Sequence, residues 1–187
     1  NEDASKVSEH ELKQYGSETN SEYLRAPYRY IEEELLSEFN NKRILDYCCG
    51  TGIFSIIPAL NGANLFGIDI SDKSIEIANK RAKFLKLEDK CTFSVGDAED
   101  LKFEDNFFDV VLSYGSMSYL DLDKSFIELK RVLKPGGKII VVDSLGYNPI
   151  INFNRRRNIK NYAPEYLDDL TTLTHKDINI CLKYFDS

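Results

Sequence analysis

Five short apolar runs, each followed by an acidic or glycine-containing loop, constrain the fold of this chain more than any other sequence feature. They cover residues 43–47, 65–69, 91–95, 108–112 and 138–142. The stretches between the first and second, second and third, and fourth and fifth runs contain apolar residues at helical spacing, as between Ser71 and Leu85. Strands that alternate with helices in this way predict a mainly parallel sheet covered by helices on both faces.

The composition of two runs supports burial on both sides of such a sheet. Val110-Val111-Leu112 and Ile139-Ile140-Val141-Val142 contain no polar residue, which is typical of strands inside a parallel sheet. Because crossovers between parallel strands are right-handed, the order β-α-β-α-β-β-α-β predicts a doubly wound α/β sheet. With 187 residues, 42% of them hydrophobic, the chain can form one domain with a substantial core.

The N-terminal part of the chain is polar and is expected to stand apart from the sheet. Residues 1–27 are interpreted as an N-terminal segment or lid, with Tyr23 contacting a bound ligand and a loose tail as the alternative. Ser8 and Glu11 have the spacing of a capping box, which predicts a short helix. Apolar residues at helical spacing predict a further helix over residues 28–39.

The remaining residues, 28–187, are expected to form one ligand-binding domain. Lys134-Pro135-Gly136-Gly137 has proline and glycine where a type II turn requires them, which predicts a turn before the last strand. Thr174 is placed to cap a final helix over about residues 175–184. The run from Arg155 to Arg157 is interpreted as solvated surface, with contact to an anionic substrate as the alternative.

Polar residues follow the predicted strands at the ends where ligands bind in this class of sheet. Open parallel sheets bind ligands beyond the carboxyl ends of their strands, at the point where the strand order reverses. The residues at these ends are Asp46, the turn from Gly50 to Gly52, Asp69, Asp97, Ser113 and Tyr114. Since several strand ends in series carry such residues, the sequence predicts one ligand site at this edge of the sheet.

The residue types at this edge fit a nucleoside ligand that also carries an ammonium group. Gly50 and Gly52 allow a tight turn and close approach of the backbone to a ligand. Asp69 lies about twenty residues after that turn, where a doubly wound nucleotide-binding fold places an acid on ribose hydroxyls. Asp97 is expected to accept a hydrogen bond from an adenine amino group. Asp46 and the carbonyl groups beside it suit an ammonium group better than a pyrophosphate.

Five motifs, in the correct order, resemble those of class I S-adenosylmethionine-dependent methyltransferases, which have a Rossmann-like fold. They are Ile44–Gly52, Gly67–Ser71, Gly96–Leu101, Phe108–Ser113 and Leu129–Gly137. The similarity extends over roughly residues 28–145. It implies that S-adenosylmethionine is the cofactor and that the chain is an enzyme that transfers its methyl group. The further cofactor-binding residues that it implies are Cys48, Ile70, Ala98, Glu99, Ser113 and Tyr114.

Two features depart from the pattern of that family. Cys48 stands where the first glycine of the first motif is expected, and its small side chain is expected still to permit close approach. The family also adds a sixth and a seventh strand, which the sequence after residue 142 does not provide. The chain is therefore interpreted as truncated or unusual at its C-terminal end, with a sheet edge that needs cover.

The methyl acceptor is expected to be a small molecule that is methylated on oxygen or nitrogen. The formal net charge of −7 disfavours binding to nucleic-acid backbones. Base-methylating enzymes of this fold carry an Asn/Asp-Pro-Pro-aromatic run where this chain has Ser113-Tyr114-Gly115-Ser116. Tyr114 and Tyr119 are expected at the acceptor side, as contacts or as packing. His10 and His175 are candidates for a general base, and the sequence assigns the catalytic role to neither.

Two other functions fit parts of the pattern. An NAD-dependent dehydrogenase would have Gly-x-Gly-x-x-Gly or Ala in the glycine turn, whereas Ser55 occupies the last of these positions. A non-catalytic partner protein that keeps the fold is the second alternative. The four cysteines lack metal-binding spacing and are expected to be free thiols in a reducing cytoplasm. No membrane-spanning run or secretory signal is visible.

Overall fold

A computed structural model describes residues 7–14, 39–143, 145–147 and 172–185, together with Arg29, Glu33, Phe153 and Arg157. Its elements are α1 (Glu9–Lys13), β1 (Arg43–Tyr47), α3 (Ile56–Leu60), β2 (Asn64–Asp69), α4 (Asp72–Phe84), β3 (Cys91–Val95), β4 (Phe108–Tyr114), the 3-10 helix η4 (Met117–Tyr119), α5 (Leu122–Val132), β5 (Leu133–Val142) and α7 (His175–Tyr184).

Part of the expected N-terminal structure lies outside these residues. Tyr23 is not among them, so its predicted contact stays a prediction. Of the helix expected over residues 28–39, Arg29 and Glu33 are described; both are helical and form an ion pair of 2.8 Å. Phe39, expected as the last residue of that helix, is buried but not helical. Arg157, the described member of the arginine run, is exposed.

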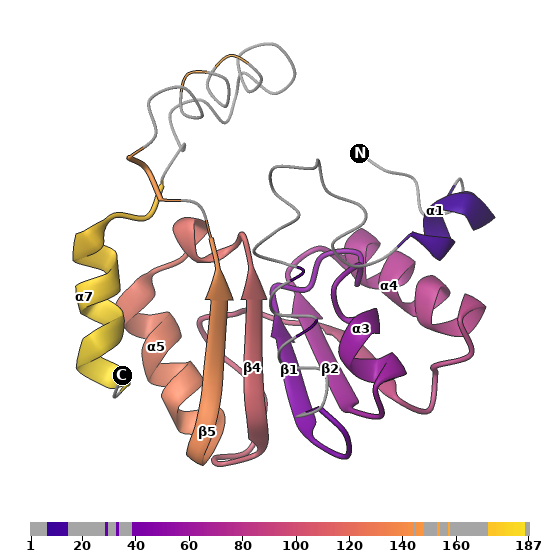
Figure 1. The fold of residues 1–187 in the computed structure, drawn as a ribbon, viewed down its shortest axis with the longest axis horizontal. Helices are drawn as coiled ribbons and strands as arrows, with labels where there is room; N and C mark the ends of the chain where they lie inside the picture. The colour runs from indigo at the N-terminus through magenta and orange to yellow at the C-terminus, as the bar shows by residue number, and fades with distance from the viewer. Residues whose placement is uncertain are drawn as a thin grey trace.

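The five described strands form one parallel sheet in the order β3-β2-β1-β4-β5, which confirms the predicted doubly wound sheet. The chain moves outward from β1 to β3 and then returns to the other side of β1 with β4. The strand order therefore reverses between β1 and β4, which is where such sheets bind ligands. Because all the strands are parallel, their carboxyl ends share one edge, the upper edge in Figure 1.

The sheet separates two hydrophobic clusters, because successive residues of a strand face opposite sides. Ile44 of β1 belongs to the cluster that contains Ile75 and Ala78 of α4. The next residue, Leu45, belongs to the cluster that contains Phe126 of α5. Helices α3 and α4 therefore cover one face and α5 covers the other, with α7 beside α5 (Figure 1).

The two runs that were predicted to be buried on both faces differ in the structure. The prediction is confirmed for Val110, Val111 and Leu112 of β4, which are at most 5% exposed. It is wrong for Ile139–Val142 of β5, where Val141 is 37% exposed and its neighbours are half-buried. The reason is that β5 ends the sheet: among the described residues no strand pairs with its outer side.

The turn predicted at Lys134–Gly137 lies within β5 and does not precede it. The strand begins at Leu133, directly after α5. Gly136 has a φ of 75°, as the third position of a type II turn requires. From the pair Phe108–Leu133 to the pair Val110–Lys138, β4 advances by two residues and β5 by five, so β5 bulges here.

Three of the described α-helices begin at the capping residues predicted for them. Ser71 caps α4 as predicted, since its hydroxyl accepts a hydrogen bond from the Ser74 N–H at 3.2 Å. The capping box of Ser8 and Thr174 as the cap of α7 are also confirmed. Helix α3, expected from Ile53, begins at Ile56, because residues 51–55 form turns.

Candidate cofactor site

The loop after β1 bends through three left-handed residues. Cys48, Gly50 and Gly52 have φ values of 60°, 52° and 73°. A Cβ atom on Gly52 would lie 3.1 Å from the Cβ of Ala78 in α4, so this glycine allows the loop to pack on the helix. A Cβ on Gly50 would meet no atom within 4 Å. Gly50 therefore marks the open side of the loop, where a ligand has room to approach.

Cys48 holds a conformation that favours glycine, which yields a prediction about stability. A non-glycine residue in the left-handed region costs roughly 1–2 kcal/mol. Cys48→Gly and Cys48→Ala both remove the thiol, but only the glycine variant also removes this cost. We expect Cys48→Gly to exceed Cys48→Ala by about 1 kcal/mol in the free energy of unfolding, measured with urea. Equal stability of the two variants would contradict a strained backbone at this position.

Asp69 joins the loop to the start of α4. Its Oδ2 accepts a hydrogen bond from the Gly50 N–H at 2.9 Å, and its Oδ1 accepts one from the Ser71 N–H at 2.9 Å. Each carboxylate oxygen can accept more than one hydrogen bond. The carboxylate is therefore held at both oxygens by the backbone and can still accept hydrogen bonds from a ligand.

A hollow of about 520 Å³, named here the strand-end hollow, lies beyond the carboxyl ends of β1, β2 and β3. It is lined by Cys48, Ile68, Asp69, Ile70, Gly96, Asp97, Ala98, Glu99, Ser116, Tyr119 and Leu120. Six of the predicted cofactor-binding residues are among these, and they come from three different loops. Sequence reasoning missed Ser116 and Leu120, although their place just after β4 was a usable signal.

The loop after β2 contributes an apolar side chain to the hollow, and the loop after β3 contributes an acidic one. Ile70 is 80% exposed and gives the lining a large aliphatic side chain. Asp97 is exposed, and its Oδ1 accepts a hydrogen bond from the Glu99 N–H at 2.8 Å. The Ala98 carbonyl accepts a hydrogen bond from the Tyr47 hydroxyl at 2.7 Å, which fixes this loop to β1.

Glu99 is held from outside the hollow. Its carboxylate accepts hydrogen bonds from the Asp121 N–H at 2.8 Å and from the Lys124 Nζ at 3.1 Å. Both partners lie at the start of α5, so Glu99 links the loop after β3 to that helix. These contacts fix a residue that lines the hollow.

Asp46 does not line the strand-end hollow. It is 2% exposed, and its Oδ2 accepts a hydrogen bond from the Ser55 hydroxyl. Burial raises the pKa of this carboxyl to about 7, against the lowering effect of the Ser55 hydrogen bond. The ammonium contact expected for Asp46 thus has no support in the lining of the hollow, and the observed role of Asp46 is to hold the start of α3.

Ser113 and Tyr114 end β4 beside the hollow without lining it. The Ser113 hydroxyl lies 2.8 Å from that of Ser116, which is part of the lining. The Tyr114 ring stacks on Phe54 with the ring centroids 4.5 Å apart. These contacts extend the site toward β4, which is the side expected for an acceptor.

Neither histidine lies in the hollow. His10 is in α1, where its Nε2 is 3.3 Å from the Gln14 amide nitrogen. His175 begins α7, and its ring stacks on Tyr147 at a centroid distance of 4.7 Å. The described lining therefore gives no histidine the position of a general base.

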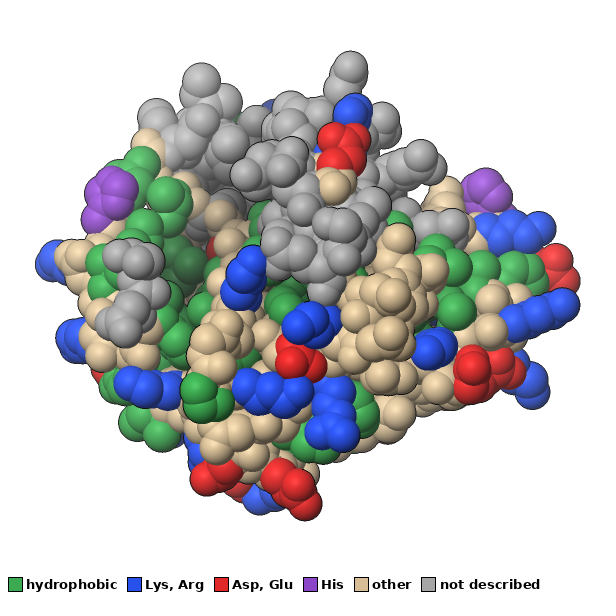
Figure 2. Space-filling model, turned by 60° about the horizontal axis from the view of Figure 1, so that its bottom comes forward, with side chains coloured by type: hydrophobic (Ala, Val, Ile, Leu, Met, Phe, Trp, Pro, Cys, Tyr) green, Lys and Arg blue, Asp and Glu red, His purple; other side chains and the backbone are tan. Residues whose placement is uncertain are grey.

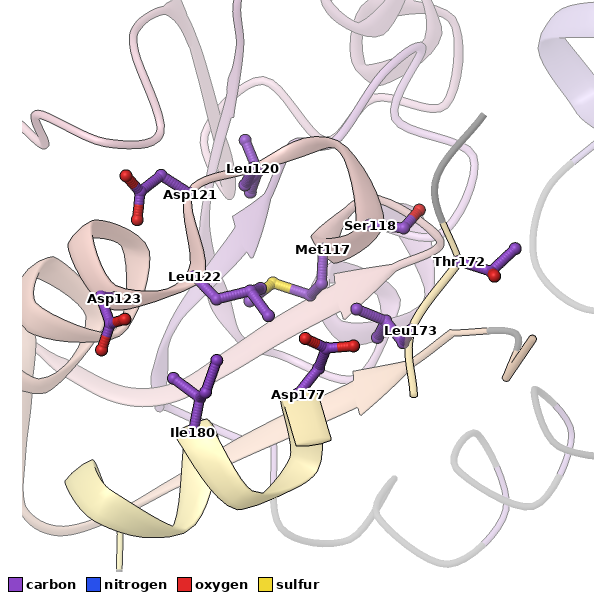
Figure 3. Close-up of a pocket in the computed structure, with 10 residues that line it drawn as sticks. All are labelled: Met117, Ser118, Leu120, Asp121, Leu122, Asp123, Thr172, Leu173, Asp177 and Ile180. Carbon is purple, nitrogen blue, oxygen red and sulfur yellow. The ribbon is translucent and has the colours of Figure 1, made fainter. Parts of the chain in front are cut away.

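A second hollow, of about 360 Å³, lies on the other side of η4 (Figure 3). In Figure 3 Asp177 points from α7 toward Met117 and Leu122, and Ile180 lies below Leu122. An adjoining, mainly apolar hollow of about 290 Å³ shares Met117, Leu122, Leu173 and Asp177 with it. Leu120 lines both the strand-end hollow and the second hollow, so the two meet at this residue.

Comparison with known sequences decides the family. The sequence profile of a methyltransferase domain family matches residues 45–141, more than half of the 187 residues. The chain belongs to this family. It is thus a class I S-adenosylmethionine-dependent methyltransferase domain, and the matched residues include the glycine turn, Asp69 and Asp97.

Curated relatives of this methyltransferase domain are named as methyltransferases that act on small molecules. Sterol 4-C-methyltransferase strm-1 of Caenorhabditis elegans is 35% identical over 154 residues, covering 81% of this chain and 46% of the relative. A demethylmenaquinone methyltransferase of Clavibacter sepedonicus is 39% identical over 117 residues, covering 62% and 46%. The chain thus spans about half the length of the curated relatives it matches.

Several solved structures superpose on this methyltransferase domain. Geranyl diphosphate C-methyltransferase from Streptomyces coelicolor superposes with a TM-score of 0.68 over 88% of this chain and 63% of that one, at 17% identity. The cyclase SpnF superposes with a TM-score of 0.56 at 31% identity, over 62% of this chain and 46% of that one. The fold match agrees with the observed sheet. In the described residues no helix is long and apolar enough to cross a membrane.

Proposed function

We propose that this methyltransferase domain binds S-adenosylmethionine in the strand-end hollow and supports methyl transfer to a small, mainly apolar molecule. The observation that carries the proposal is the lining of that hollow. It combines a held carboxylate and an exposed aliphatic side chain at the end of β2 with a second carboxylate after β3, in a sheet whose family uses this cofactor.

The residues present fit the adenosine part of the cofactor. Asp69 offers lone pairs to ribose hydroxyls while its oxygens are fixed by Gly50 and Ser71. Ile70 offers an apolar surface for a flat ring, and Asp97 offers an acceptor for an amino group. Gly50 leaves the loop backbone open toward the ligand. Cys48, Ala98 and Glu99 complete the proposed contacts, and Tyr23, Asp46, Gly52, Ser113 and Tyr114 remain predictions.

Bound S-adenosylmethionine supplies an electrophilic methyl group on a sulfonium. The protein contributes proximity and alignment, which are worth up to about 7–11 kcal/mol in favourable cases. Among the described residues, the hydroxyls of Ser113 and Ser116 and the ring of Tyr119 lie on the side of the hollow toward β4. We propose that they position the acceptor and keep water away from the reacting atoms.

Two observations favour an apolar small-molecule acceptor. The 290 Å³ hollow beyond η4 is lined largely by apolar side chains, including Met117, Leu122 and Leu173. The curated relatives are named for sterol and demethylmenaquinone, which consist mainly of hydrocarbon. Their names include transfer to carbon, and a rice relative is named a probable tocopherol O-methyltransferase. The acceptor atom is therefore carbon or oxygen in this proposal, and nitrogen remains a sequence prediction.

A nucleic-acid acceptor has no comparable support. The net charge is −7. On the face shown in Figure 2, Lys and Arg side chains are interspersed with acidic and apolar ones. Phosphate backbones are bound through clustered positive charge, and the described side chains on this face form no extended basic surface.

The test combines binding with transfer. We expect calorimetry to detect binding of S-adenosylhomocysteine and no binding of NADH. We also expect labelled methyl groups from S-adenosylmethionine to appear on at least one sterol, quinol or tocopherol-type acceptor. Binding of NADH alone would overturn the proposal in favour of a dehydrogenase. Cofactor binding with no transfer to any acceptor would favour a non-transferase role. The observation that favours this alternative is the 31% identity to SpnF, which is named a cyclase.

A further inference from the structure

Arg81 is a buried cation whose hydrogen bonds join three parts of the chain. It lies in the last turn of α4 and is 3% exposed. Its Nε donates to the Thr51 carbonyl at 3.1 Å. Its Nη1 donates to the carbonyls of Glu11 and Leu12 at 2.8 and 3.0 Å and also to that of Gln14. These four acceptors are all backbone carbonyls, at sequence separations of 30 to 70 residues.

The three N-terminal acceptors lie at the C-terminal end of α1. Helix ends leave carbonyls without partners inside the helix, and a cation there is favourable for the helix dipole. Helix α1 has five residues, too few to be stable by itself. It lies against α4 (Figure 1). Leu12 is buried, and the Nζ of Lys13 lies 5.6 Å from the ring centre of Phe84 in α4. Arg81 therefore supplies a large part of the attachment of α1.

The fourth acceptor lies in the glycine turn of the strand-end site. Thr51 stands between Gly50, whose N–H is held by Asp69, and Gly52, which packs on Ala78. The turn is thus held by Asp69 at the end of β2, by packing on Ala78 in the middle of α4 and by Arg81 near the end of that helix. Loss of the Arg81 side chain would therefore remove hydrogen bonds to both the glycine turn and α1.

We infer that Arg81 is a positioning residue that couples the docking of α1 to the geometry of the cofactor-binding turn. This inference rests on the proposed function, because it assigns the turn a cofactor to bind. Coupling between two sites is reciprocal, so cofactor binding tightens α1 to the same degree that docked α1 tightens cofactor binding.

The experiment compares Arg81→Met with Arg131→Met in the full chain. Arg131 serves as the control: it also donates to two backbone carbonyls, of Leu101 and Phe103, but it lies in α5 on the opposite face of the sheet and also pairs with Glu128 and Asp105. We expect Arg81→Met to weaken S-adenosylhomocysteine binding about tenfold and to speed hydrogen exchange of the amides of Leu12 and Gln14 by a similar factor, while Arg131→Met changes each less than about twofold.

A double-mutant cycle with Ser8→Ala separates coupling from simple loss of stability. Ser8 caps α1 and does not contact Arg81 or the turn. With Arg81 present, loosening α1 through Ser8→Ala should weaken cofactor binding about two- to threefold, and in the Arg81→Met background it should have no further effect. In the unmutated chain, S-adenosylhomocysteine should slow exchange in α1.

The outcomes are distinct. Failure of the unmutated chain to bind S-adenosylhomocysteine would overturn the proposed function itself. Binding by the unmutated chain, together with equal affinity in Arg81→Met or equal Ser8→Ala effects in both backgrounds, would overturn the coupling alone. A lower melting temperature with unchanged affinity would make Arg81 a residue of general stability, which also contradicts the inference.

Discussion

Replacing Asp69 with alanine is expected to weaken S-adenosylhomocysteine binding by about 10- to 100-fold, the effect of losing charge-assisted hydrogen bonds worth roughly 1.5–3 kcal/mol. The carboxylate fixes the Gly50 and Ser71 N–H groups, each at 2.9 Å, and is proposed to accept the ribose hydroxyls. Its removal therefore releases the turn and removes a ligand contact at once. Calorimetric titration of the purified variant measures the change.

Two further variants identify the cause of that loss. Asp72→Ala removes the same charge three residues later, from an exposed side chain that does not line the strand-end hollow. It should bind within about twofold of the unmutated chain, since exposed charges contribute little. Asp69→Asn keeps the size of the side chain and one acceptor oxygen, so its affinity should lie between those of the unmutated chain and Asp69→Ala. Unchanged affinity in Asp69→Ala would remove this carboxylate from the proposed site.

Replacing Asp46 with asparagine is expected to raise the free energy of unfolding at pH 8 by up to about 4 kcal/mol. This value corresponds to a pKa difference of about three units between the folded and unfolded states, at about 1.36 kcal/mol for each unit. Burial raises the pKa of the Asp46 carboxyl from 3.8 to about 7. The folded state therefore binds more protons than the unfolded state between these values, so stability falls as the pH rises through this window. The neutral amide avoids burial of a charge and still accepts the Ser55 hydrogen bond.

The measurement is the free energy of unfolding in urea at pH 5, 6.5 and 8 for both proteins. The difference between them should be smaller at pH 5 than at pH 8, because the unfolded carboxyl is ionised throughout this range and the folded one ionises only near pH 7. Taking the difference cancels the titration of every other group that the two proteins share. A constant difference across this range would show that the Asp46 carboxyl titrates normally in the folded chain.

The alternation of apolar runs and helical patterns was sufficient to predict the sheet and its winding. Strand ends such as Asp69 and Asp97 could be located because parallel strands must place their carboxyl ends on one edge. Local chemistry was equally readable: Ser71, Ser8 and Thr174 cap helices as their residue types predict. Six of the predicted cofactor residues line one hollow for the same reason.

Other features depended on neighbours that are distant in sequence. Val141 looks like a residue of a central strand, and it is exposed because β5 ends the sheet. Asp46 looks like a ligand-binding acid, but it is buried and accepts a hydrogen bond from Ser55, the residue directly before α3. Burial and partner choice are set by how elements pack, which local sequence patterns do not encode.

By itself the sequence determined the α/β class, the order of elements and the strand ends that carry polar residues, because periodicity and turn chemistry act over a few residues. Only the tertiary structure decided which of those residues share a hollow, and that Arg81 joins α1 to the glycine turn. Those contacts connect residues 30 to 70 positions apart, and their formation depends on the packing of α1 and the loop against α4.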